Sequence, residues 1–369
     1  MSDSVRVSSG NAREDKEEHV TRRLICLVLC CAAIIVPKAV QAESWHAVAG
    51  AESPDHALQV IAFLPNEMWI HTGDGITWSF SAREPHSATF LMPGLVRPAF
   101  TVGCPVTNTT PDPSAFDNSS CVNSGRITTV GTTYTVTFPK PGNYRLVCLV
   151  HVNMTATIHV LDASLPLPHD QAFYDAEGAR QARALLMDHD GAPRTMREDA
   201  HREGGEASLH SHHHMVTVAT GEVVSTPGGI NSVTVMRFMQ PSITIHAGET
   251  VEWDSLDVSG HTVTFGTEPP NVTPQTPPST NVFADTDGAR HAIIFSTSDN
   301  VHSGFIAQAG HERIGIAQAA PPTAPLISPP LPAGPVTRFR ATFMSPGVYP
   351  YICAFHDQLG MKGEVIVLP

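Results

Sequence analysis

Near its C-terminus the chain reads Tyr349-Pro350-Tyr351-Ile352-Cys353-Ala354-Phe355-His356-Asp357-Gln358-Leu359-Gly360-Met361. A thiol, an imidazole and a thioether stand within this stretch in the pattern Cys-x2-His-x4-Met. Thiolate and thioether are soft ligands, which copper accepts together with imidazole. Two His, one Cys and a weak axial Met form the ligand set of copper sites that carry electrons, so this stretch lacks one His.

The missing His appears when the two halves of the chain are aligned. Four segments match: 70–78 with 245–253, 86–90 with 261–265, 122–125 with 301–304, and 137–144 with 342–349. His261 follows His86 by 175 residues and Cys353 follows Cys148 by 205, so the second half carries 30 extra residues. A duplication is the natural explanation of these matches.

Each half supplies a complete set of candidate copper ligands in the same order. The sets are His86, Cys148, His151 and Met154 in the first half, and His261, Cys353, His356 and Met361 in the second. A rigid scaffold that holds such a set lets a copper ion change oxidation state with little movement of its ligands. A buried thiol that merely lies beside surface His and Met would not explain two matched sets.

These motifs resemble those of the cupredoxin family over roughly residues 43–162 and 215–369. The first ligand loop, Cys-x2-His-x2-Met, is similar to that of amicyanin-like members, and the second is similar to that of plastocyanin-like members. The resemblance implies an all-β fold of two tandem Greek-key β-sandwiches. It also implies two type 1 (blue) copper sites that transfer electrons between redox protein partners, with His151 and His356 as electron ports at the surface.

One departure from the family pattern concerns the residue after the first ligand His. Many cupredoxins have an Asn there, which braces the ligand loop, whereas this chain has Ser87 and Thr262. We therefore expect the groups that support the ligands to differ from those of the family.

Composition and local pattern predict the remaining architecture. Charged residues make up 15% of the chain, while 31 Pro and 27 Gly favour short strands joined by turns. Residues 172–187 are rich in Ala, Leu and Arg and predict one surface helix. In the insertion we expect irregular chain at 269–280 and 319–335, with strands at 292–295 and 305–307. We thus predict a signal peptide at 1–42, cupredoxin domains at 43–162 and 210–369, and a partly helical linker at 163–209.

The N-terminus predicts export to the periplasm or the extracellular space. Arg22 and Arg23 precede an apolar run at 24–36, and small residues near Ala42 suit a signal peptidase. Association with a membrane is expected only if this segment is retained as an anchor. Export favours a disulfide between Cys104 and Cys121, which bracket a polar loop. Cys148 and Cys353 are then left unpaired, and metal ligation gives them a role.

Other functions were weighed against electron transfer. A net charge of −13 makes nucleic acid a poor partner. A two-domain copper oxidase or nitrite reductase would need His beside Cys or His-x-His pairs on early strands, and neither surrounds these ligands, so no enzyme is predicted. A copper-delivery protein is the other alternative. The segment His210-Ser211-His212-His213-His214-Met215 would suit it by capturing metal, or it is simply a solvated stretch before the second domain.

Overall fold

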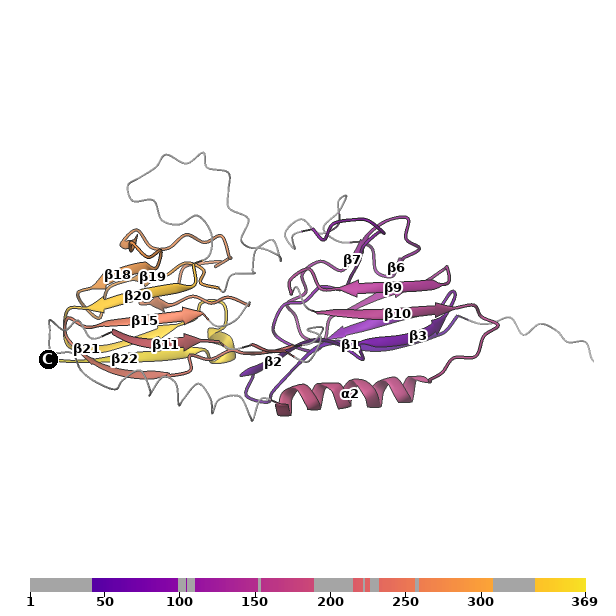
Figure 1. Cartoon of the computed structure of the whole chain (residues 1–369), viewed down its shortest axis with the longest axis horizontal. Helices are drawn as coiled ribbons and strands as arrows, with labels where there is room; N and C mark the ends of the chain where they lie inside the picture. Colours follow the sequence, from indigo (N-terminus) through magenta and orange to yellow (C-terminus); the bar gives the residue numbers. More distant parts are fainter. Residues whose placement is uncertain are drawn as a thin grey trace, which may run out of the picture. The chain divides into compact units, whose positions relative to one another are not determined.

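The computed structural model describes residues 42–98, 104, 110–151, 154–188, 215–221, 223–225, 232–255, 259–307 and 336–369. The predicted signal peptide and residues 210–214 of the His-rich segment lie outside these ranges, apart from Ala42. Within them the chain forms four sheets and one α-helix (Figure 1). The predicted all-β, two-domain fold is confirmed.

The first domain is a sandwich of two sheets. Its strands are β1 (Ser44–Glu52), β2 (Leu58–Leu64), β3 (Glu67–His71), β4 (Gly75–Phe80), β5 (Thr89–Phe90), β6 (Ser114–Ala115), β7 (Val122–Asn123), β8 (Thr133–Thr137), β9 (Gly142–Val147) and β10 (Thr155–Leu161). One sheet contains the order β2-β1-β4-β8-β6, and the other is β3-β10-β9-β5-β7. Alternating burial, as in β4 and β8, follows from one face of each strand packing on the core.

The second domain repeats most of this arrangement, although the edge strand β2 of the first domain has no counterpart in it. Its strands are β11 (Met215–Thr220), β14 (Ser242–His246), β15 (Thr250–Ser255), β16 (Thr264–Phe265), β17 (Val282–Ala284), β18 (Arg290–Ile294), β19 (Val301–His302), β20 (Arg338–Phe343), β21 (Gly347–Ile352) and β22 (Lys362–Leu368). Its sheets have the orders β11-β15-β20-β18-β17 and β14-β22-β21-β16-β19. In both domains the first strand pairs in parallel with the strand that carries the matched Trp.

Matched aromatic side chains fill the two cores. Trp78 and Phe90 have ring centroids 5.7 Å apart in the first domain, and Trp253 and Phe265 have centroids 5.8 Å apart in the second. Both Trp side chains are buried, and aromatic pairs at such spacings add to the free energy gained by burial. The sequence repeat is therefore a repeat of packing as well.

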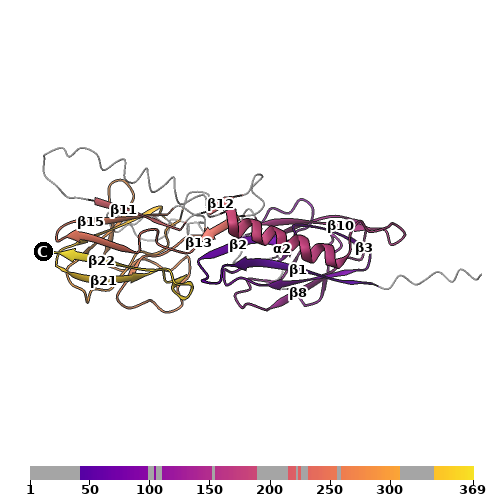
Figure 2. The same ribbon diagram turned by 90° about the horizontal axis from the view of Figure 1, so that it is seen from below.

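The predicted helix is present as α2 (Gln171–Asp188) and covers the outer face of β1 and β2 (Figure 2). Tyr174 is its main anchor: the Tyr174 hydroxyl accepts from the Trp69 backbone N–H at 2.8 Å and donates to the Trp69 carbonyl at 3.1 Å. Gly178 lies one turn later and allows a close approach, because a Cβ there would lie only 3.1 Å from the Leu64 backbone. The neighbouring Phe173, by contrast, is exposed.

A hairpin between β11 and β14 joins the sheet of the first domain. It consists of β12 (Val223–Ser225) and β13 (Ser232–Val235), and β13 pairs antiparallel with β2. The Met236 backbone N–H extends this pairing by donating to the Ala57 carbonyl at 2.7 Å. The hairpin ties the chain of the second domain to the edge of the first.

The insertion is only partly as predicted. Residues 269–280 are irregular and 290–294 form β18, as expected. The strand predicted at 305–307 is wrong: Ile306 forms isolated bridges with His261 and Val336, and residues 305–307 form no continuous strand. Among the described residues, α2 lacks the combination of length and apolar character that would let it cross a bilayer.

Candidate metal centres

The first candidate centre lies at one end of the first sandwich. His86 precedes β5, while Cys148 and His151 lie in the loop that follows β9. The Nδ1 atoms of His86 and His151 are 3.2 Å apart, and the Cys148 Sγ lies 3.8 Å from the His151 Nδ1. All three side chains are buried, so their nitrogen and sulfur atoms converge on one point shielded from water.

The second candidate centre has the same construction. His261 and His356 place their Nδ1 atoms 3.1 Å apart. The Cys353 Sγ lies 3.5 Å from the His356 Nδ1 and 3.8 Å from the His261 Nδ1. In each centre the ligand atoms lie within 4.8 Å of one another. Two imidazole nitrogens and one thiolate are a donor set that suits copper.

Each Met closes its ligand loop and is fully buried. The Cys148 backbone N–H donates to the Met154 carbonyl at 3.0 Å, and the Cys353 N–H donates to the Met361 carbonyl at 3.0 Å. The longer second loop contains a 3-10 turn at Asp357–Leu359. These bonds fix both Met residues next to the Cys of their own loop.

Ser87 and Thr262 brace the ligand loops in place of the Asn found in many cupredoxins. The Ser87 hydroxyl accepts from the Leu149 backbone N–H at 2.8 Å, and its own backbone N–H points at the Cys148 Sγ at 3.3 Å. In the second domain the Thr262 hydroxyl accepts from the Ala354 N–H at 2.8 Å. The Thr262 backbone N–H is likewise 3.4 Å from the Cys353 Sγ. A hydroxyl thus replaces the amide.

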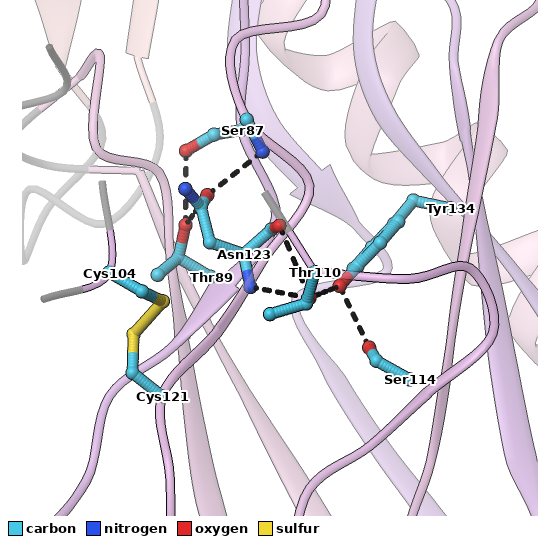
Figure 3. Close-up of a disulfide and its surroundings, with 9 residues drawn as sticks. Ser87, Thr89, Cys104, Thr110, Ser114, Cys121, Asn123 and Tyr134 are labelled. Carbon is cyan, nitrogen blue, oxygen red and sulfur yellow. Dashed lines mark hydrogen bonds between the residues drawn. A yellow bond between two sulfur atoms is a disulfide. The ribbon is translucent and has the colours of Figure 1, made fainter. Parts of the chain in front are cut away.

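In the first domain this brace continues to the predicted disulfide region (Figure 3). The Ser87 and Thr89 hydroxyls are 3.2 Å apart, and the Thr89 hydroxyl donates to the Asn123 Oδ1 at 2.8 Å. Asn123 lies two residues after Cys121, which forms the predicted disulfide with Cys104. The disulfide therefore lies beside the strand that supports the first centre.

Electrostatics favour the thiolate form of both Cys residues. Burial raises the pKa of the Cys148 thiol, but hydrogen bonds from His151 and His86 outweigh burial and hold it well below its usual value. Burial also raises the pKa of the Cys353 thiol, but the charge of His356 and the hydrogen bonds from His261 and His356 outweigh burial and hold it well below its usual value. Thiolate is the form that binds metal.

Glu84 reaches both centres. Its side chain is 5% exposed, and it accepts from the His151 Nε2–H through Oε1 at 3.1 Å. Its Oε2 lies 3.4 Å from the His356 Nε2, which is within ion-pair distance but does not have the geometry of a hydrogen bond. Burial alone would raise the pKa of this carboxyl, but its contacts with His151 and then with His356 hold it far below its usual range.

The prediction that His151 and His356 reach the surface is therefore wrong. The two side chains are 4% and 6% exposed, and their outer nitrogens face Glu84 instead of water. Burial lowers the pKa of His151, but hydrogen bonds to Cys148 and Glu84 outweigh it and raise the pKa to about 9. Glu84 was not predicted from the sequence, because a single acid before His86 forms no recognisable motif.

Gly50 is a second residue that the sequence did not reveal. It has a φ of 74°, and a Cβ at this position would lie 2.6 Å from the His86 Nε2. The His86 ring therefore packs directly on the backbone of β1, where only glycine fits. The predicted His, Cys and second His of each domain are thus brought together, while the His-rich segment stays a prediction because only its Met215 is described.

Comparison with known proteins places these observations in a family. The model of copper binding proteins of the plastocyanin/azurin family matches residues 53–161 and 222–368. A crystal structure of amicyanin from Paracoccus versutus (Thiobacillus versutus) is similar with 18% identity, covering 43% of this chain and 85% of that chain at a TM-score of 0.21. The oxidized form of plastocyanin from Dryopteris crassirhizoma is similar with 19% identity, covering 42% and 100% at a TM-score of 0.21. A search of curated proteins found no match.

Two separate matches to one family model agree with two sandwiches that each bury a His, a Cys and a second His at one end. The chain is a two-domain member of the plastocyanin/azurin family of copper binding proteins.

Proposed function

We propose that this protein carries electrons between redox protein partners by means of two type 1 copper centres. The first centre would be held by His86, Cys148, His151 and Met154, and the second by His261, Cys353, His356 and Met361. When bound, copper would supply a one-electron couple. The observation that supports the proposal most strongly is that two matched, buried His–Cys–His groups are each closed by a Cys-to-Met backbone hydrogen bond.

The surrounding residues suit electron transfer better than copper delivery. Both thiolates and both Met side chains are fully buried, and hydroxyl braces hold the ligand loops in place. A copper-delivery protein must open its ligand loop to release the ion, whereas an electron carrier works best when its ligands stay fixed. We further propose that the protein is exported to the periplasm or outside the cell, which the disulfide and the N-terminal sequence support.

The test is copper quantitation with an optical spectrum of the purified protein. We expect two copper ions per chain and an intense visible band from thiolate bound to copper. Cys148→Ser and Cys353→Ser should each remove one copper and its share of the band. A protein in which neither substitution changes the colour would contradict the ligand assignment.

Two further measurements separate the alternatives. Copper transfer to an acceptor protein, without reversible reduction by a small redox protein, would favour delivery. Catalytic reduction of dioxygen or nitrite over multiple turnovers by the pure copper-loaded protein would favour an enzyme.

A further inference from the structure

The two candidate centres share one buried acid. Glu84 belongs to the first domain, yet its two oxygens approach one imidazole from each domain, His151 at 3.1 Å and His356 at 3.4 Å. Both contacts are made by Nε2, whereas the Nδ1 atoms of the same rings face the thiolates at 3.8 and 3.5 Å. Each ring is therefore held on one side by its own domain's Cys and on the other by the same carboxylate.

The backbone of Glu84 is itself held in place. The Glu84 backbone N–H donates to the side-chain carbonyl of Gln59 at 3.1 Å, and Gln59 is fully buried in β2. The Gln59 amide donates in turn to the Glu52 carboxylate at 3.0 Å and to the His56 carbonyl at 3.1 Å. Because a buried carboxylate without partners would be strongly destabilising, its two imidazole contacts account for its burial.

We infer that Glu84 is a positioning residue shared by both centres, which fixes the imidazole of His151 with one oxygen and that of His356 with the other. This inference rests on the proposed function, since it assumes that both groups bind copper. Residues that accept the outer N–H of a metal-binding His set the tautomer and orientation of the ring and raise its basicity. The consequence here is that a change in the first domain alters the copper site of the second.

Single-centre proteins separate the effects on the two sites. In the full-length chain, Cys353→Ser leaves the first centre and Cys148→Ser leaves the second. Glu84→Ala is then introduced into each, and copper affinity is measured by competition with a chelator. Loss of such a supporting partner costs about 10- to 100-fold in metal affinity, and we expect a loss of that size in both backgrounds.

Glu67→Gln is the matched control. Glu67 also accepts from an imidazole Nε2, that of His159 at 2.9 Å, but the pair is partly exposed and neither residue is a candidate ligand. It should leave the copper affinity of both single-centre proteins unchanged. A loss with Glu84→Ala in only one background, or in neither, would overturn the shared role.

A second variant and a second readout guard against a folding defect. Glu84→Gln keeps the side-chain volume but offers one acceptor and one donor, so it can satisfy only one of the two N–H groups. It should weaken at least one centre, and no loss in either background would also overturn the inference. In His-labelled protein loaded with Cu(I), NMR should show slowly exchanging imidazole N–H signals of His151 and His356 that Glu84→Ala removes, while the signals of the buried His86 and His261 remain.

These measurements distinguish the inference from the proposed function. If neither single-centre protein with an intact Glu84 binds copper, the proposed function fails. If both bind copper and Glu84→Ala changes the copper affinity of neither, only the shared role fails.

Discussion

Position 302 offers a test of the second domain that needs no metal. His302 is 3% exposed, its Nδ1 lies 2.8 Å from the Thr264 hydroxyl, and its Nε2 has no hydrogen-bond partner in the described part of the chain. Burial, and then the nearby Arg290 guanidinium, lower the pKa of His302 to about 4. The first domain has Asn123 at the equivalent place, where its Oδ1 accepts from the Thr89 hydroxyl.

The expected effect follows from proton linkage. The folded domain holds His302 neutral down to about pH 4, whereas the unfolded chain takes up a proton near pH 6.5. The contribution of neutral His302 to the free energy of unfolding is therefore fully present above about pH 6.5 and is lost as the pH falls toward 4. Between pH 7.5 and 4.5 the loss amounts to roughly 2.5 kcal/mol, because one pKa unit corresponds to about 1.36 kcal/mol.

His302→Asn should abolish this part of the pH dependence. The substitution gives the second domain the side chain that the first domain already uses at this place. Hydrogen exchange of the β20 and β21 amides in the metal-free protein reports opening of the second domain by itself. We expect the free energy of opening to fall about 2.5 kcal/mol less in the variant than in the wild type between pH 7.5 and 4.5.

The amides of β9 and β10 serve as the internal control, since they report the first domain and should respond to pH equally in both proteins. The overall stability of the variant does not enter, because only the change with pH is compared. Equal pH dependence of the β20 and β21 amides in wild type and variant would show that His302 is not held neutral by burial.

Three further predictions concern the groups that support the fold and the ligand loops. Replacing Cys104 and Cys121 by Ser opens a loop whose ends are 17 residues apart, and urea unfolding should show a loss of about 3 kcal/mol in the first domain. Thr262→Val leaves the Ala354 N–H without its acceptor and should cost about 1–3 kcal/mol in the second domain, while Thr262→Ser should restore it; the opposite order would argue against a hydroxyl brace. Tyr174→Phe removes two hydrogen bonds to the Trp69 backbone and should lower thermal stability by about 1–3 kcal/mol, whereas Phe173→Ala, at an exposed position of the same helix, should change it little.

Most of the predictions made from the sequence came from its internal repeat. Trp78 with Phe90 and Trp253 with Phe265 are recognisable as equivalent because core aromatic residues fix the spacing of strands, and that spacing is preserved in both halves. The Cys104–Cys121 disulfide followed from the chemistry of export. The helix was recognised from its composition, but its anchor was not, because the Tyr174 contacts depend on where α2 lies against β3.

What the sequence did not indicate is contact between residues that share no motif. The surface location of His151 and His356 was implied by the resemblance to the family, which gives no sign that Glu84 lies against both rings. The strand predicted at 305–307 failed because Ile306 forms isolated bridges to His261 and Val336 and no continuous ladder. Both errors have the same cause: local pattern does not reveal which part of the chain packs on a given segment.

The alignment of the two halves nevertheless distinguishes Glu84, because the second half has no acid at the equivalent position. At the offset that aligns His86 with His261, Glu84 aligns with Ser259, whose hydroxyl lies 3.2 Å from that of Thr234. The second copy therefore supplies no carboxylate at this place, and the single Glu84 contacts one imidazole in each domain. A single carboxylate has two oxygens, enough for one N–H from each domain. A duplicated pair of sites that shares one acceptor must therefore lose its symmetry at that position.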